Sequence, residues 1–551
     1  MSSSTNIAER FRKFLTGRKA SLLLLLFCIV SKSLLIGFYT YTGKDKIYSL
    51  SAGYNLLHGK GWTNSFYYLD NTSKEILEPF CYWPPGYGLL MTPYQAVFGT
   101  DLYTGTLVLE ITCFIVFLLL CRSILKLNRV PMHWVNAATL LLSFFPHDFI
   151  ENSLGTDLPA LDFILGFFFF SLKTWNAGDK KHAIIYGLLA GLCLFGAGFT
   201  RFIYTPVCLF IALVFGLLGT WKKTRVASAG ALTCLLVATA GLVAEMVFQT
   251  SLCGSPFYSG VDKTGLFWKN LTYWHPAAIA AFANLNLIPV QLEKLTPISY
   301  ADWLYIFSAV NLVAYPVLLV IFCNYFWKRK DAPAKDFPIF TATGFLFSAG
   351  IIGGLALLSL THDAKYTLFG NAWTFIVEGR YHAVPVVFLQ LLFFILIAKQ
   401  HIRLFGRGFS SMLFTFLAAV MIATALHQVY YTVKVATKFR SMKSASIREQ
   451  DYAWFQRFLK QTVQENPGKD ILVLSSDRYY PLMASMHQQK GIADPYSINE
   501  KIPRVDKPSI LITVSFEPEK NLYSNYLARK DVRLIKDING ARFYRQEIQP
   551  Q

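Results

Sequence analysis

Charged residues are scarce in this sequence. Asp, Glu, Lys and Arg together make up 15% of its 551 residues, well below the ~25% of soluble domains. Apolar residues make up 54%, and the mean hydropathy is +0.38. This composition excludes a large soluble core. Together with repeated apolar runs of about twenty residues, it indicates a polytopic membrane protein.

Acidic residues are the scarcer charge, with 33 Asp and Glu against 52 Lys and Arg and a formal net charge of +19. The basic residues fall in short clusters between apolar runs, which is the positive-inside pattern of membrane proteins. A nucleic-acid footprint would gather them on one surface, so we expect no nucleic-acid partner.

Metal-binding and nucleotide-binding motifs are also missing. The sequence has nine cysteines but no CxxC, and most of the cysteines lie inside apolar runs. Cys81 and Cys253 fall in polar loops on the same predicted side of the membrane, where a disulfide and two free thiols are both consistent with the sequence. The tail from about residue 435 has no GxGxxG or P-loop pattern, so it carries no sign of a nucleotide site.

Eleven apolar segments predict about 11 transmembrane helices: 20–41, 103–125, 132–148, 158–175, 183–199, 203–220, 227–249, 302–326, 337–360, 380–398 and 410–430. Every second loop between them is basic, which places the N-terminus in the cytoplasm. We therefore expect a transmembrane domain at 1–434, with a long first outer loop at 42–102.

The tail predicts a small extracytoplasmic α/β domain at 435–551, large enough to fold by itself. Its pattern predicts a helix at 446–466. Apolar runs of strand length predict strands at 470–475, 509–514, 532–535 and 541–544.

Asp45 follows the first apolar segment directly, at the predicted outer boundary of the membrane. Partial desolvation of a carboxylate raises its basicity and suits it to accept a proton from a nucleophile. Its neighbours Lys44 and Lys46 stabilise the anion and can attract a phosphate group. The alternative is a charge that only marks the end of a helix.

The same loop contains a rigid aromatic turn that includes Trp83 and Tyr87 and leads into an apolar stretch at 89–98. This pattern is typical of an amphipathic segment on the outer leaflet, although Trp and Tyr also anchor membrane proteins in general. Glu78, just before the turn, is a second acidic candidate.

Two further outer regions hold candidate residues. The short loop near 149–157 contains Asp148, Glu151 and Asp157, which can hold a divalent cation through oxygen ligands or simply be solvated. Arg201 and the pair Arg380-Tyr381 put cations on a face that should be poor in them. A guanidinium suits phosphate oxygens, and the alternative is an ion pair with one of the loop acids.

These segments resemble, in order, the motifs of GT-C glycosyltransferases. The closest group is the family-39-like set of protein O-mannosyltransferases and lipid A aminoarabinose transferases. The segments that carry the resemblance are the loop from Asp45 through Tyr48 to Gly61, the turn Pro84-Pro85-Gly86-Tyr87, Thr200-Arg201, Gly379-Arg380-Tyr381 and the tail segment from Leu472 to Tyr480.

The resemblance implies transfer of a sugar from a polyprenyl-phosphate donor, usually with inversion, to an acceptor on the outer side. Asp45 maps onto the catalytic base. Lys46 stands where the family has a second acid, which moves any supporting role to Glu78, Asp148, Glu151 or Asp157.

We expect Arg201, Arg380 and Lys46 to bind the donor phosphate, and Tyr48, Trp83, Tyr87 and Tyr381 to support substrate binding. A divalent metal is an open alternative and no cofactor is certain. The acceptor is a lipid, a glycan or a protein. The expected location is a bacterial inner (plasma) membrane, with the active site on the extracytoplasmic face.

Two other classes of function compete with a transferase. A transporter or lipid-carrier flippase is the first, although the halves of the sequence show no internal repeat. A membrane-anchored scaffold is the second, and it leaves Asp45 and Arg201 without a purpose.

Overall fold

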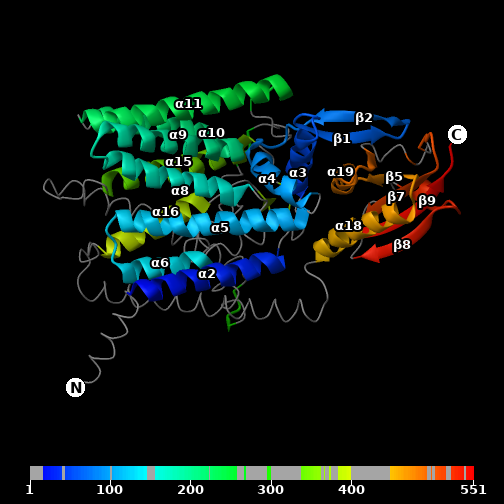
Figure 1. Cartoon of the computed structure of the whole chain (residues 1–551), viewed down its shortest axis with the longest axis horizontal. Coiled ribbons are helices and arrows are strands. Elements are labelled where there is room, and N and C mark those ends of the chain that lie inside the picture. The colour runs from blue at the N-terminus through cyan, green and yellow to red at the C-terminus, as the bar shows by residue number, and fades with distance from the viewer. Residues whose placement is uncertain are drawn as a thin grey trace, which may run out of the picture. The chain divides into compact units, whose positions relative to one another are not determined.

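A computed structural model of the chain describes residues 17–39, 44–99, 102–144, 156–221, 224–256, 266–268, 295–298, 337–361, 365–366, 372–373, 383–398, 447–492, 498, 503–516, 523–538 and 541–550 (Figure 1). The chain divides into two units. The helical unit comprises Met1–Ile36, Ile111–Phe248 and Ser259–Lys434, and the sheet unit comprises Gly37–Glu110, Gln249–Tyr258 and Val435–Gln551.

The helical unit is built from long apolar helices. Three of these helices also contain residues that belong to the sheet unit, because the boundary between the two units falls within them. The helices are α2 (Arg18–Tyr39), α5 (Leu102–Leu127), α6 (Met132–Phe144), α8 (Asp157–Trp175), α9 (Lys180–Thr200), α10 (Thr205–Trp221), α11 (Arg225–Cys253), α15 (Phe337–Thr361) and α16 (Ala383–Ala398). A three-residue 3-10 helix, η1 (Phe202–Tyr204), directly precedes α10. A two-stranded ribbon, β3 (Lys365–Tyr366) and β4 (Ala372–Trp373), follows α15.

Among the described residues, five stretches are long and apolar enough to cross a membrane: Gly105–Leu127, Asp157–Trp175, Lys180–Thr200, Phe202–Trp221 and Arg225–Cys253. The predicted segments 302–326 and 410–430 lie outside the described residues. Each of the other predicted segments coincides with a helix. An integral membrane protein with mostly helical structure is therefore confirmed, while the count of eleven and the orientation stay predictions.

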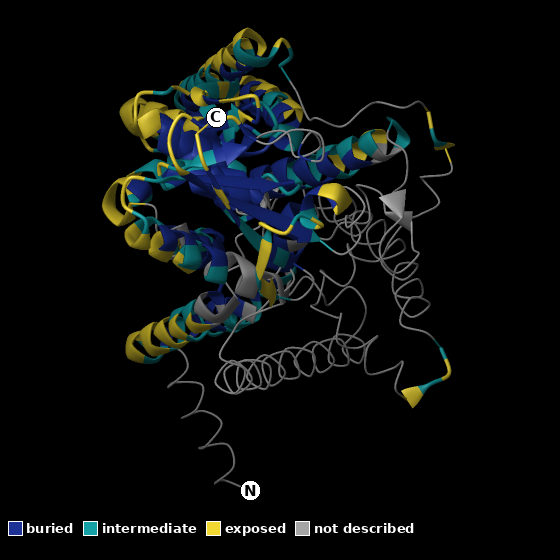
Figure 2. Ribbon diagram, turned by 90° about the vertical axis from the view of Figure 1, so that its right-hand side faces the viewer, coloured by how far each residue is buried: buried dark blue, intermediate teal, exposed yellow. Residues whose placement is uncertain are grey.

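Small residues let these helices pack closely. An ideal Cβ built on Gly187 of α9 would lie 2.0 Å from the carbonyl oxygen of Gly230 in α11, so the two backbones touch where both side chains are absent. Such close packing is expected in a membrane, because lipid tails are as apolar as the side chains and burial of apolar surface does not drive the helices together. Large apolar side chains remain exposed on the outer helix faces, among them Leu22, Leu213 and Leu236, as expected for surfaces that meet lipid. Figure 2 shows exposed stretches along several helices, whereas the centre of the sheet is buried.

The sheet unit combines the first outer loop with the tail. The loop forms α3 (Lys44–Leu57), β1 (Thr63–Tyr68), β2 (Asn71–Pro79) and α4 (Gly86–Phe98). The tail forms α18 (Ile447–Glu465), β5 (Asp470–Ser475), α19 (Tyr479–Met486), β6 (Lys490–Ile492), β7 (Ser509–Phe516), α20 (Ser524–Leu527), β8 (Arg533–Ile538) and β9 (Ala541–Ile548). The predicted tail helix and its four predicted strands are all present.

One seven-stranded sheet joins the two segments, in the order β2-β1-β6-β5-β7-β9-β8. Strands β6, β5 and β7 are parallel, and β9 runs antiparallel to β7 and β8. The hairpin β1–β2 extends the parallel end through a pairing of Tyr67 with Ile492. Continuous apolar runs in β5 and β7 explain their central position, because both faces of such strands are buried.

The tip of this hairpin is part of the core of the tail. Leu69 packs with Leu472, Leu474 and Ile492, and its carbonyl oxygen accepts a hydrogen bond of 3.1 Å from the backbone N–H of Arg504. The sequence placed residues 42–102 with the helices and treated the tail as a domain of its own. In the structure the loop instead supplies two strands and core side chains to the tail.

Candidate active site

Asp45 is the second residue of α3, so it lies in the first turn of that helix. The described structure does not extend to its side chain. The next residue, Lys46, is 1% exposed, and its Nζ forms an ion pair with Oε1 of Glu110 in α5, which is itself buried. Removing one partner of a buried ion pair leaves an uncompensated charge, which is strongly unfavourable. The pair therefore fixes the start of α3, and with it the position of Asp45 in the backbone.

Close packing against α4 fixes the rest of α3. An ideal Cβ on Gly88 of α4 would lie 2.7 Å from the carbonyl oxygen of Ser49 in α3. The side chain of Gln95 donates a hydrogen bond of 2.7 Å to the carbonyl oxygen of Leu50. Because Gly88 has no side chain, α3 can lie closer to α4 than any other residue at this position would allow.

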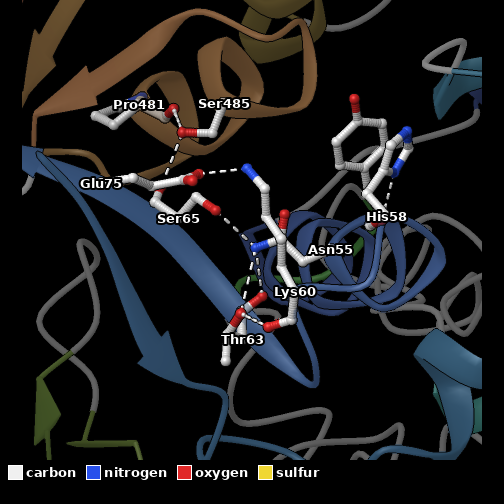
Figure 3. Close-up of polar contacts among 9 residues, drawn as sticks. Asn55, His58, Lys60, Thr63, Ser65, Glu75, Pro481 and Ser485 are labelled. Carbon is white, nitrogen blue, oxygen red and sulfur yellow. Dashed lines mark hydrogen bonds and ion pairs between the residues drawn. The ribbon is translucent and has the colours of Figure 1, made fainter. Parts of the chain in front are cut away.

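Polar contacts connect α3 to the hairpin, and the hairpin to α19 (Figure 3). Asn55 of α3 donates hydrogen bonds of 2.8 Å to the carbonyl oxygen of Thr63 and to Oγ of Ser65, both in β1. Ser485 of α19 donates to the carbonyl oxygen of Ser65 at 2.8 Å. The turn between α3 and β1 needs Gly59 and Gly61 at φ +74°, a conformation that glycine adopts without strain. The helix that carries Asp45 is thus connected to the α/β segment.

Aromatic rings from the predicted turn gather beside α3. The ring centroid of Tyr48 lies 5.6 Å from that of Tyr82 and 6.2 Å from that of Trp83. Trp62 and Phe80 form the buried base beneath these half-buried rings. Pro84 and Pro85 follow and lead into α4. The sequence predicted an aromatic turn here, and the structure shows that it packs on α3.

Glu78, at the end of β2, pairs with an arginine from the tail. Nη1 of Arg478 lies 3.0 Å from Oε2 of Glu78, with both side chains about one third exposed. Burial is the largest single influence on the pKa of Arg478 and lowers it, but Glu78, Tyr48 and Tyr82 together raise it by more, so the net shift is upward. Burial raises the pKa of Tyr48 far above its ordinary value, against the opposing effect of Arg478. Tyr48 is therefore a neutral hydroxyl and Arg478 a cation at any physiological pH.

Cys81 and Cys253 form a disulfide in the sheet unit, with Cα atoms 5.7 Å apart. The sequence left this pairing open. The bond links the aromatic turn to the last residue of α11. Because structural disulfides persist in oxidising compartments, it agrees with an extracytoplasmic position for both loops.

We expect this disulfide to be present in the purified protein. Non-reduced peptides should contain Cys81 and Cys253 linked, and the double variant Cys81→Ser/Cys253→Ser should lose about 2–4 kcal/mol of stability. Thermal unfolding in detergent measures the loss. The matched control is reduction, which should lower the unfolding temperature of the wild-type protein but not that of the double variant. Alkylation of both cysteines in unreduced protein would contradict the bond.

The helical unit contains a second buried ion pair, between Arg201 and Asp157. Asp157 is the first residue of α8 and 3% exposed, whereas Arg201 follows the last residue of α9 and is 7% exposed. Since α8 and α9 are antiparallel neighbours, the start of one lies beside the end of the other. Each charge also suits its helix end, where the dipole favours an anion at the N-terminus and a cation at the C-terminus. Of the alternatives for Arg201, the structure shows an ion pair with a loop acid.

The remaining predicted residues divide into two groups. Tyr87 is fully buried in α4. Arg380, Tyr381, Asp148 and Glu151 lie outside the described residues. Within the described part of the chain, no group of three or more His, Cys, Asp or Glu side chains is arranged to hold a metal ion.

Two polar residues of this region were not assigned a role from the sequence. Arg478 and Asp477 follow the buried strand β5, at the carboxyl end where ligands bind in many parallel sheets. The sequence did contain a signal for them, because four polar residues, Ser475 to Arg478, directly follow the apolar run Ile471 to Leu474. The partner of Arg478 could not be foreseen, because Glu78 is 400 residues away in the chain.

No protein-family model matches this chain, and no curated protein matches it. Two similar solved structures are both of ArnT from Cupriavidus metallidurans. The one bound to undecaprenyl phosphate is 12% identical, with a TM-score of 0.46 over 96% of this chain and 98% of that chain. The one in the apo state is 13% identical, with a TM-score of 0.48 over 95% and 97%. Likeness at this level assigns no activity and no residue role to this chain.

Proposed function

We propose that this protein is a membrane glycosyltransferase. It moves a sugar from a polyprenyl-phosphate donor to an acceptor on the extracytoplasmic face. The observation that carries the proposal is the position of Asp45, in the first turn of a helix that follows an apolar helix directly and is held by the Lys46–Glu110 ion pair. General-base catalysis needs an acid on a well-positioned backbone segment, and the first turn of α3 is such a segment.

In the proposed reaction Asp45 accepts a proton from the acceptor hydroxyl or amine as that group attacks the anomeric carbon. The bond from this carbon to the phosphate oxygen breaks, and the polyprenyl phosphate leaves as an anion. We assign Arg201 and Arg380 to this anion, because fixed cations near a low-dielectric site stabilise developing charge. A guanidinium carries five N–H donors, so Arg201 can bind a phosphate while it keeps Asp157.

The proposed phosphate ligand Lys46 has a different partner in the structure. Its ammonium group is buried and already neutralised by Glu110, so contact with a phosphate would require that pair to open. We therefore give Lys46 the role of holding the first turn of α3. The orientation of the chain, with the disulfide and Asp45 outside, is part of the same proposal.

One observation favours transport as a second candidate function. Glu245 in α11 is 4% exposed, and among the described residues neither oxygen of its carboxyl group has a hydrogen-bond partner. Ionisable groups inside membrane helices often mark solute or proton paths. A lipid-carrier flippase would use such a group without any transfer of sugar.

A doubly labelled donor distinguishes the two functions. Vesicles that contain the protein, together with envelope extract as the source of acceptor, receive a polyprenyl-phosphate sugar with one label on the sugar and another on the lipid. We expect the labels to separate, with free polyprenyl phosphate as the lipid product, and protein-free vesicles serve as the control. Labels that change leaflet together would establish the flippase instead. Labels that stay together without changing leaflet would contradict both functions.

A further inference from the structure

A half-buried surface in the sheet unit combines aromatic rings with a polar edge. We call it the Trp83 surface. It consists of Tyr48, Glu78, Tyr82, Trp83, Asp477 and Arg478. The rings come from the first outer loop and the guanidinium from the tail. The charged groups act on Tyr48 directly, because Arg478, Asp477 and Glu78 all influence its pKa.

The residue types of this surface suit a sugar ring. The centroids of Tyr82 and Trp83 lie 5.9 Å apart, and such rings offer an apolar face beside polar groups. The ion pair of Glu78 and Arg478 is about one third exposed. A carboxylate and a guanidinium together have several acceptor and donor positions, so the intact pair can hydrogen-bond to hydroxyl groups while the rings cover the apolar face of the sugar.

The charge of the surface disfavours an anionic ligand. Among the described groups that act on Tyr48, Glu78 and Asp477 are carboxylates and Arg478 is a cation, and the charge of Arg478 is already balanced by its ion pair with Glu78. A phosphate or carboxylate ligand would meet no excess positive charge, and like charges at a binding surface cost affinity. A neutral, hydroxyl-rich ligand meets no such penalty.

The position of the surface relates it to the proposed base. Tyr48 lies three residues after Asp45 in α3, so the two positions share one side of that helix. Arg478 lies just beyond the carboxyl end of β5, the end of parallel strands at which ligands bind. The disulfide of Cys81, between Phe80 and Tyr82, holds the aromatic turn in place.

We propose that the Trp83 surface binds the acceptor and that the acceptor is a neutral carbohydrate. The role of this ligand as acceptor rests on the proposed transferase function, whereas the binding of a neutral carbohydrate does not depend on that function. Stacking on Trp83 holds the sugar ring, and the Glu78–Arg478 pair selects hydroxyl groups. Arg478 is therefore a specificity-determining residue supplied by the tail to a surface of the first outer loop.

The test measures binding without any donor. The full-length protein in nanodiscs is applied to an array of neutral oligosaccharides, phosphorylated oligosaccharides, and Ser- and Thr-containing peptides. We expect binding to neutral oligosaccharides. The variants Trp83→Ala and Arg478→Ala should each weaken it by about tenfold or more, the scale of one lost hot-spot contact. Trp83→Phe, which keeps a ring, should weaken it less.

Tyr68→Ala is the matched control, because this tyrosine of β1 is 51% exposed and lies outside the surface. It should leave binding unchanged, and the Cys81–Cys253 bond in every variant reports an intact fold. Binding of phosphorylated sugars or peptides alone, or full binding by folded Trp83→Ala, would overturn the proposal. If the protein binds no neutral sugar but still separates the donor labels, the transferase proposal stands and only the acceptor-site proposal fails. If it binds neutral sugars but does not separate the labels, only the transferase proposal fails.

Discussion

Replacing Asp45 by asparagine is expected to reduce sugar transfer by about 10²–10⁴-fold, the contribution of a positioned general base. Asparagine has nearly the same shape as aspartate, so binding of the donor and the packing of α3 should change little. The amide cannot accept the proton that the attacking acceptor releases. Initial rates of separation of the donor labels, normalised to the amount of folded protein, measure the effect.

A second acid in the same loop provides the matched control for this variant. Asp70 lies in the exposed turn between β1 and β2, so Asp70→Asn should transfer sugar at the wild-type rate. Full turnover by Asp45→Asn at normal expression would remove Asp45 from the catalytic role. An equal loss in both variants would point to general damage to the loop.

Replacing Arg201 by methionine is expected to destabilise the protein by about 3–5 kcal/mol, the cost of breaking a buried ion pair. The carboxylate of Asp157 would remain 3% exposed without its guanidinium partner. Transfer should be lost as well, because the proposed ligand of the donor phosphate is gone. Thermal unfolding in detergent measures the first effect, and the labelled donor measures the second.

The double variant Arg201→Met/Asp157→Leu separates stability from phosphate binding. Apolar residues in place of both charges should restore stability, since an apolar replacement for a buried pair is often neutral or stabilising. Transfer should stay lost. A double variant that recovers transfer together with stability would assign Arg201 a purely structural role.

Arg122→Met is the control for loss of a buried arginine as such. Arg122 is 6% exposed and donates hydrogen bonds to the neutral side chains of Ser21, Asn136 and Thr139. We expect this variant to lose stability but to keep its transfer rate per folded molecule. That result would show that the loss in Arg201→Met is specific to its position.

The membrane helices were predictable because their signal is local. A run of about twenty apolar residues identifies a helix without knowledge of any partner, and α5, α8, α9, α10 and α11 all coincide with such runs. The strands β5 and β7 were equally clear, because a short apolar run bounded by polar residues predicts a buried strand. The first outer loop was different. Its two helices and its hairpin are short, α3 and the hairpin are rich in polar residues, and their positions depend on contacts with distant segments.

The partners of the candidate residues show the same limit. Lys46 and Glu110 are 64 residues apart, and Glu78 and Arg478 are 400 apart, so no local pattern indicates which cation meets which acid. For Arg201 the sequence narrowed the choice to a loop acid or a phosphate. Only the antiparallel packing of α8 and α9 shows that Asp157 is the acid. Which side chains form a pair depends on how whole helices and strands pack against one another.

The amino-acid sequence was enough to identify a helical membrane protein with an α/β tail, and the site residues that it suggested remain part of the proposed function. It could do so because apolar length and charge alternation are properties of single segments. Two features became visible only in the tertiary structure. The first outer loop and the tail share one sheet. A disulfide joins the aromatic turn to α11, and buried ion pairs join α3 to α5 and α8 to the end of α9. Those contacts depend on free energy gained between segments that are distant in the chain, which no single segment contains.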